Sequence, residues 1–309
     1  TCCVIPNLLL NSGESLIVVD IKGELAAVTR RVREAMGHEV RLYNPFHQTF
    51  SDELGIPLGD VGFDPCDLIR PGNTVKDDVE LLASLLLPMP AKPDPKSEFF
   101  IDWGQLILAA SLLDQLRAGR RATLPDARRW LMAMPQDLEA QFSEMTKSTA
   151  FGGVLRETGA KLLGTLINAP EEFQGGLSTA QKALRIYDGF GPMGDHVRRC
   201  GSQCFADYKR RPITGYIILP SDRQSTHAAY MNLVLSSAIE SIARERSNTR
   251  VTFLIDEFAT IGYLPNLLRA MGQYRAQGIR IHAVIQQVSQ VRRLYGNDGW
   301  RDIAGLCDV

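Results

Sequence analysis

Five short apolar runs separated by helical patterns constrain the fold of this 309-residue chain most strongly. The runs are Leu16–Asp20, Val40–Asn44, Gly215–Leu219, Val251–Asp256 and Ile281–Gln286. Their length and apolar content are typical of strands that are buried on both faces of a parallel sheet. Helical patterns between them occupy Glu24–Met36, Ala228–Arg246 and Leu264–Gln277. This alternation predicts an α/β fold, in which helices cover both faces of an open parallel sheet.

The segment between the second and third runs is too long to be a loop. From Pro71 to about Val197 it consists almost entirely of candidate helices, separated by proline and glycine: Val75–Leu87, Phe99–Arg117, Pro125–Met132, Pro135–Lys147, Phe151–Leu166 and Leu177–Tyr187. We therefore expect an all-α domain, residues 71–200, inserted into an α/β core. Residues 1–70 form the first part of that core, and residues 201–309 form the second.

The charge balance and the cysteines exclude several classes of protein. Lys and Arg number 34 against 35 for Asp and Glu, so the formal net charge is −1. This excludes a histone-like polycation, but it leaves open nucleic acid held in a local groove or ring. The cysteines do not suggest a disulfide scaffold, and Cys200 and Cys204 have no neighbouring Cys or His pair to complete a zinc site.

The two ends of the sequence are unusual. The chain begins at Thr1 on an apolar run and stops at Leu306–Val309. We interpret it as an internal fragment of a longer protein. No apolar stretch approaches the roughly 20 residues that a transmembrane helix needs, so we expect any membrane anchor to lie outside it.

The sharpest local motif is Phe253–Phe258, in which an apolar strand ends at Asp256 and Glu257. This is the form of the Walker B strand of P-loop ATPases. The strand would bring both carboxylates to the carboxyl edge of the sheet, where α/β folds bind ligands. There Asp256 could hold Mg²⁺, and Glu257 could polarise the water that attacks a γ-phosphate. The alternative is that the motif only begins a helix.

Two further strand ends carry polar groups to the same edge. The Gln286 carboxamide could hydrogen-bond the γ-phosphate or the attacking water, although Gln286 and Gln287 could also simply cap the strand. Asp20–Glu24 follows the first run, where a capped strand-to-helix turn explains the pattern as well. The sequence contains no G-x-x-x-x-G-K-[ST] motif. Either a phosphate loop lies upstream of Thr1, or the chain is not a P-loop protein.

An ordered series of motifs resembles the type IV secretion coupling proteins, the conjugative DNA-transfer ATPases of the TraG/TraD-like family. In chain order the motifs are Val4–Leu9, Val18–Glu24, Tyr43–Phe46, Leu219-Pro220, Leu254–Ala259 with Gly262 and Pro265-Asn266, and Ile285-Gln286 with Gln290 and Tyr295-Gly296. Each motif is ambiguous alone, but the series runs over nearly the full chain. The resemblance implies a RecA-like P-loop NTPase sheet with an inserted all-α domain. It also implies a phosphate loop directly before Thr1, without which the fragment would be inactive as an ATPase.

The resemblance assigns roles to individual residues. Asp256 would bind Mg²⁺, Glu257 would be the catalytic base, and Gln286 would sense the γ-phosphate of ATP. The candidate nucleotide-binding residues, at the start of the chain and after its first strand, are Thr1, Asp20 and Lys22.

A ring-shaped ATPase also needs an arginine that reaches the γ-phosphate of the neighbouring subunit. Arg275 and Arg280 are the candidates for this arginine finger, with Arg269 as a third.

The resemblance finally implies partners and a location. Family members form homo-hexamers and are held in the bacterial inner membrane by an N-terminal anchor, so this portion would face the cytoplasm. The expected partners are single-stranded DNA, bound without sequence specificity, its attached relaxase, and the type IV secretion channel with its ATPases. Basic clusters could line the ring's channel; they are Arg117 with Arg120-Arg121, Arg128-Arg129, Arg198-Arg199, Lys209–Arg211 and Arg292-Arg293.

The expected function is an ATP-driven coupling protein that recruits a relaxase–DNA substrate and delivers or pumps it to the secretion channel. Two alternatives remain open. One is a substrate receptor for which ATP hydrolysis is dispensable, and the other is a related hexameric DNA translocase of chromosome segregation.

Overall fold

The computed structural model describes residues 4–47, 49–50, 56–201 and 204–307. Its chain divides into two units: Thr1–Phe63 with Asp195–Val309, called here the α/β unit, and Asp64–Gly194, called the helical unit. The division expected from the sequence lay after residues 70 and 200. The first part of the core ends earlier because the turn after Phe63 belongs to the helical unit, where the Asp64 carboxylate pairs with Arg121 at 2.9 Å.

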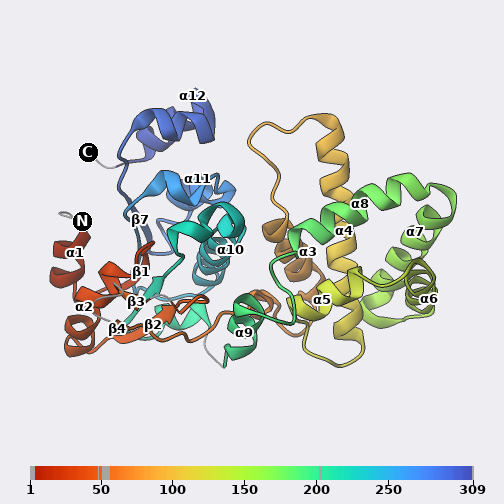
Figure 1. Cartoon of the computed structure of the whole chain (residues 1–309), viewed down its shortest axis with the longest axis horizontal. Helices are drawn as coiled ribbons and strands as arrows, with labels where there is room; N and C mark the ends of the chain where they lie inside the picture. The colour runs from red at the N-terminus through yellow and green to blue at the C-terminus, as the bar shows by residue number, and fades with distance from the viewer. Residues whose placement is uncertain (1–3, 48, 51–55, 202–203, 308–309) are drawn as a thin grey trace. The chain divides into compact units, whose positions relative to one another are not determined.

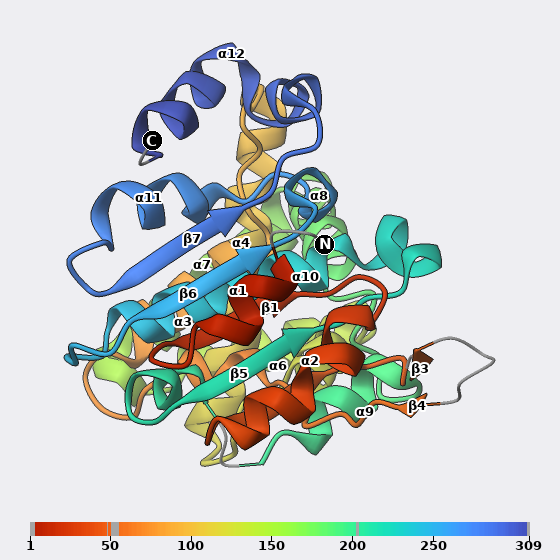
Figure 2. The same ribbon diagram turned by 90° about the vertical axis from the view of Figure 1, so that its left-hand side faces the viewer.

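A five-stranded parallel sheet forms the centre of the α/β unit (Figure 2). Its order is β2-β5-β1-β6-β7, with bounds Glu39–Tyr43, Ile213–Ile217, Ser15–Val19, Val251–Ile255 and Ile279–Ala283. In the register of the central strand, Val18 lies opposite Tyr216 of β5 and Leu254 of β6. The three strands β1, β5 and β6 are buried along their whole length, which is why their apolar runs predicted them correctly.

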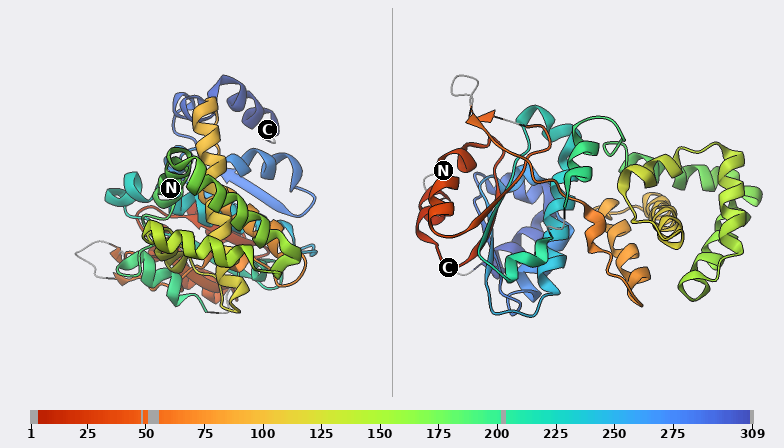
Figure 3. Two further views of the ribbon diagram at one scale, coloured as in Figure 1. Left: turned by 90° about the vertical axis from the view of Figure 1, so that its right-hand side faces the viewer. Right: turned by 90° about the horizontal axis from the view of Figure 1, so that it is seen from below.

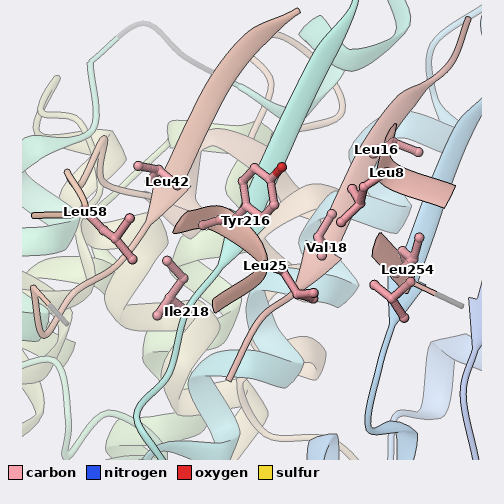
Figure 4. Packing of buried hydrophobic residues seen from close by; sticks show 11 residues of the cluster. Leu8, Leu16, Val18, Leu25, Leu42, Leu58, Tyr216, Ile218 and Leu254 are labelled. Atoms are coloured by element: carbon pink, nitrogen blue, oxygen red, sulfur yellow. The ribbon is translucent and has the colours of Figure 1, made fainter. Parts of the chain in front are cut away.

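Helices cover both faces of this sheet (Figures 2 and 3). The helices α1 (Val4–Leu10) and α2 (Glu24–Ala35) lie on one face, and α10 (Gln224–Ala243) lies on the other. Figure 4 shows a buried cluster on the face of the sheet that α1 and α2 cover. Its residues are Val4, Leu8, Leu16, Val18, Leu25, Ala26, Leu42, Leu58, Tyr216, Ile218 and Leu254. This burial fixes the strand ends whose side chains build the candidate site.

Two further helices follow the strands β6 and β7 along the chain. The helix α11 (Pro265–Gln273) lies between β6 and β7, and α12 (Val288–Leu306) follows β7. The sequence did not predict α12, because Gly296 at φ 76° interrupts it and breaks its apolar period. The two-residue strands β3 (Thr49–Phe50) and β4 (Ile56–Pro57), an antiparallel pair, were also missed. Elements this short leave no periodic pattern.

The helical unit confirms the predicted series of six helices (Figure 1). They are α3 (Val75–Leu86), α4 (Pro95–Arg117), α5 (Leu124–Leu131), α6 (Pro135–Thr146), α7 (Val154–Asn168) and α8 (Pro170–Ala183). A short α9 (Pro192–Arg199) leads back toward β5, after which η3 (Phe205–Lys209) precedes the strand. α4 contacts α3, α5, α7 and α8, because its second half is apolar on every side and buries Ile107, Leu108, Leu112 and Leu113.

The start of α8 corrects one prediction. The sequence predicted a helix that begins at Leu177, whereas α8 begins at Pro170. Proline is well tolerated at the first position of a helix, where its missing N–H has no intrahelical partner. Gly175 and Gly176 lie inside the helix, where the lack of a side chain lets α4 approach closely: a Cβ atom would lie 2.2 Å from Phe100 and 2.7 Å from Trp103. None of the helices in the described ranges is long and apolar enough to cross a bilayer.

Candidate functional site

The candidate site lies at the carboxyl ends of three neighbouring strands, β1, β6 and β7. Because the strands are parallel, the residues that follow them meet at one edge of the sheet: Asp20 after β1, Asp256 and Glu257 after β6, and Gln286 after β7. The β6–β7 pairing continues past the strands, since Val284 N–H donates to the Ile255 carbonyl at 2.8 Å and Phe258 N–H donates to the Val284 carbonyl at 3.1 Å. These bonds hold the two following segments side by side.

Glu257 and Gln286 are brought into direct contact by this extension. The Gln286 Nε2 atom donates to Glu257 Oε1 at 3.3 Å. The hydrogen bond links the predicted catalytic base to the predicted γ-phosphate sensor. Gln286, rather than Gln287, is therefore the residue that faces the carboxylate, because Gln287 serves as the N-cap position of α12.

A cavity of about 80 Å³, called here the acidic cavity, joins the two acidic strand ends. It brings together four predicted groups, and its lining is Val19, Asp20, Ile21, Lys22, Glu24, Leu25, Asp256 and Glu257. Four carboxylates and one ammonium group give this lining an excess of negative charge. Such a cavity favours a cation, or a phosphate group that arrives together with a divalent metal.

Asp20 has a structural role at this cavity in addition to the predicted one. Its carboxylate accepts the backbone N–H of Ala26 at 2.8 Å, so it caps the start of α2. Burial raises the pKa of Asp20 to about 6, although hydrogen bonds from the backbone of Ala26, Leu25 and Gly23 favour the charged form. The alternative interpretation of the sequence, a capped strand-to-helix turn, therefore describes Asp20 correctly, while Asp20 also lines the cavity.

A second cavity, of about 390 Å³, lies on another side of Glu257 and is called here the Arg293 cavity. It is lined by residues that follow β6, by the end of the β7 extension and by α12: Glu257, Phe258, Ala259, Thr260, Gln286, Gln290, Arg293 and Leu294. Glu257 is thus shared by both cavities. Sequence reasoning assigned neither Gln290 nor Arg293 to this site. The spacing Gln286, Gln290, Arg293 is a helical signal that could have joined them.

The candidate arginine fingers lie elsewhere. Arg280 is the second residue of β7, at the opposite end of that strand, and it pairs with Glu14 at 3.1 Å. Arg275 is exposed in the turn between α11 and β7. Arg269 forms an ion pair with the buried Glu240 of α10. None of the three lines either cavity of its own chain. Thr1 lies outside the described residues.

The acidic residues fit Mg²⁺ as it binds together with a nucleotide. Within the described ranges, no group of three or more His, Cys, Asp or Glu side chains could hold a metal by itself. Mg²⁺ in phosphate-transferring sites uses one or two carboxylates and completes its shell with water and phosphate oxygens. Asp256, which lines the acidic cavity, can supply such a carboxylate.

Comparisons with known proteins agree with this geometry. The conjugal transfer protein TraG of Agrobacterium fabrum is 25% identical over 302 residues, which cover 93% of this chain and 42% of that protein. TraG of Escherichia coli is 25% identical over 336 residues, which cover 99% of this chain and 49% of that protein. The chain thus spans less than half the length of these relatives.

A solved structure shows the same fold over nearly the whole chain. The plasmid coupling protein TrwB in complex with ADP and Mg²⁺ superimposes with a TM-score of 0.68 at 18% identity, over 95% of this chain and 61% of that chain. This confirms the predicted fold class, a RecA-like P-loop NTPase sheet that carries an inserted set of helices. The model of the type IV secretory system conjugative DNA transfer family matches residues 1–305. The chain therefore belongs to the conjugative DNA transfer family of type IV secretory systems.

Proposed function

We propose that this chain is the nucleotide-hydrolysing part of an ATP-driven coupling protein, which recruits a relaxase–DNA substrate and delivers it to a type IV secretion channel. The observation that carries the proposal is the meeting of Asp256, Glu257 and Gln286 at one edge of a RecA-like sheet. TrwB, which has this fold, binds ADP and Mg²⁺ and also an ATP analogue. The family membership supplies the transfer role.

Each residue of the site has a separate role in the proposed hydrolysis. Asp256 and the nucleotide phosphates would hold Mg²⁺, which neutralises the charge on the phosphates when it is bound. Glu257 takes the proton of the attacking water. Gln286 holds the Glu257 carboxylate by the 3.3 Å hydrogen bond and thereby orients it. Lys22 and Asp20 line the acidic cavity, where they would act on the bound nucleotide or its metal. Thr1 completes the proposed nucleotide-binding set.

The assembly is also part of this proposal. A homo-hexameric ring would place Arg275 or Arg280 of one subunit toward the nucleotide of the next. The ring would be held at the bacterial inner membrane through an N-terminal anchor, with this portion on the cytoplasmic side. Its partners would be single-stranded DNA with bound relaxase, and the secretion channel with its ATPases.

The substitution Glu257→Gln in the full-length protein tests the catalytic assignment. We expect turnover to fall by about 10²–10⁴-fold, because the amide cannot accept the proton of the water, while the affinity for ATP is kept. A suitable control is Glu139→Gln, which changes an exposed carboxylate of α6 in the helical unit by the same one atom. Phosphate production and nucleotide binding are measured on the same preparations.

DNA transfer by the same variants separates the two function classes. An ATP-driven motor requires that Glu257→Gln abolishes transfer. Transfer at the wild-type frequency with hydrolysis abolished would contradict the motor and favour a receptor for which hydrolysis is dispensable.

A further inference from the structure

Glu257 lines two cavities that differ in charge and in size. The acidic cavity is small, whereas the Arg293 cavity has a volume of about 390 Å³ and is lined by one carboxylate, Glu257, and one cation, Arg293.

The donors of the Arg293 cavity are available to a ligand. In the part of the chain that the structure describes, no acidic side chain lies within ion-pair distance of Arg293, and no group accepts from the Gln290 carboxamide. The Thr260 hydroxyl donates to the Glu257 carbonyl at 2.6 Å, which leaves its oxygen to accept. An available guanidinium group beside an available amide is the donor set that recognises a phosphate.

The other basic clusters of the chain differ from this one. Most of their arginines are paired with carboxylates close by: Arg117 with Asp114, Arg121 with Asp64 and Asp67, Arg129 with Asp126, Arg198 with Asp195, and Arg210 and Arg211 with Asp207. Arg292 and Arg293 have no such pair among the described residues. An arginine that is paired with a carboxylate attracts an anion only weakly. Arg293 has no such pair within the described ranges, so its positive charge is available to attract an anion.

The direction of hydrolysis would bring the phosphate toward Glu257, which lines this cavity. The attacking water and the leaving ADP lie on opposite sides of the γ-phosphorus. The bond from phosphorus to the bridging oxygen breaks and its electron pair stays on ADP, while a bond to the water oxygen forms. One water proton stays on the phosphate and the other passes to Glu257. The phosphorus therefore moves away from ADP toward the water, which is the side on which Glu257 stands.

We propose that the Arg293 cavity is a binding site for the inorganic phosphate released by hydrolysis, with Arg293 and Gln290 as its ligands. This inference rests on the proposed ATPase function.

Equilibrium binding of inorganic phosphate tests the site without requiring turnover. The full-length protein is held with Mg²⁺ and ADP and titrated with radiolabelled phosphate. We expect Arg293→Gln to weaken phosphate binding by about tenfold or more, because a charge-assisted hydrogen bond is removed. We expect Glu257→Gln to tighten it by a similar factor, because the substitution removes the carboxylate from the cavity lining. The double variant is expected to bind no more tightly than the wild type.

Arg292→Gln is the matched control, since Arg292 is exposed on the same helix and does not line the cavity. It should bind phosphate as the wild type does. Arg293→Lys keeps the charge and should retain part of the affinity. Thermal unfolding of each variant confirms that it is folded.

Several results would overturn the proposal. Arg293→Gln could bind phosphate as tightly as Arg292→Gln does, or it could abolish the hydrolytic step itself in a single turnover. A third contradictory result is a weaker affinity for single-stranded DNA with unchanged phosphate binding, which would make Arg293 a ligand of backbone phosphates. Failure of the proposed ATPase function would give a different result, because the wild type and Glu257→Gln would then hydrolyse ATP at equal rates. The phosphate titration is measured independently of hydrolysis.

Discussion

At the scale of single residues, the α/β unit is held by a buried cation that no motif indicated. Arg33 of α2 is completely buried and donates to the Leu8 carbonyl at 3.1 Å, to the Glu14 carbonyl at 3.4 Å and to Thr214 Oγ1 at 2.9 Å. It also donates to the Asn11 carbonyl. These bonds satisfy carbonyls at the carboxyl end of α1 and in the turn to β1, where a cation is favoured.

Loss of Arg33 should therefore destabilise the fold strongly. We expect Arg33→Met to lower the free energy of unfolding by about 2–4 kcal/mol, because several buried carbonyls lose their donor. Arg31→Met is the control, since Arg31 is exposed on the same helix and should change stability by less than about 0.5 kcal/mol. Urea unfolding followed by circular dichroism measures both. Equal midpoints for the two variants would refute this role for Arg33.

The neighbouring His38 makes stability depend on pH. Burial and the nearby Arg33 guanidinium lower the pKa of His38 below its ordinary value of 6.5. Below pH 6.5 the unfolded chain binds a proton that the folded chain does not, so the free energy of unfolding decreases as the pH falls. We expect wild type to lose more stability than His38→Gln between pH 7.5 and pH 5.5. Parallel pH profiles in urea unfolding would contradict this expectation.

At the scale of secondary-structure elements, periodic patterns determined what could be predicted. The strands β1, β5 and β6 and the predicted helices of the helical unit were found because each buries a regular apolar face. The predicted strand ends therefore placed Asp256, Glu257 and Gln286 at one edge of the sheet, where the structure also has them. Gln290 and Arg293 were not assigned to the site, because α12 is broken at Gly296 and only tertiary packing directs its first half toward Glu257.

Glycine was the other source of error, because the sequence cannot tell a glycine that ends a helix from one that lets two helices approach. Gly176 of α8 belongs to the second kind, since a Cβ there would lie 2.7 Å from Trp103 Cβ of α4. We expect Gly176→Ala to cost about 1–3 kcal/mol through overpacking, although alanine favours a helix. Gly164→Ala in α7 meets nothing within 4 Å and should stabilise by up to about 1 kcal/mol. A melting temperature above that of the wild type for both variants would disprove the close approach of α8 and α4.

At the scale of the whole molecule, the formal net charge of −1 is accompanied by ion pairs within most of the basic clusters. Most arginines of the basic clusters are paired with carboxylates of the same or a neighbouring element, such as Arg129 with Asp126 at 2.8 Å. Their charge is local and does not create a broad positive surface. The proposed binding of nucleic acid would therefore depend on the few cations that are left unpaired, and among the described clusters Arg292 is exposed and has no acidic partner.

Single-stranded DNA should accordingly distinguish Arg292 from a paired arginine. We expect Arg292→Gln in the full-length protein to weaken DNA binding and to reduce the salt dependence of log K by about 0.7 for each phosphate that the protein no longer neutralises, because fewer counterions are released. Arg129→Gln removes the same formal charge but from an ion pair, so its effect should be small. Fluorescence anisotropy with an unstructured oligonucleotide over a range of salt concentrations measures both. If the two variants lose equal affinity and equal slope, DNA responds to overall charge rather than to the unpaired cation. If Arg292→Gln alone loses both, DNA binds at the carboxyl edge of the sheet, beside the residues that we propose to hydrolyse ATP.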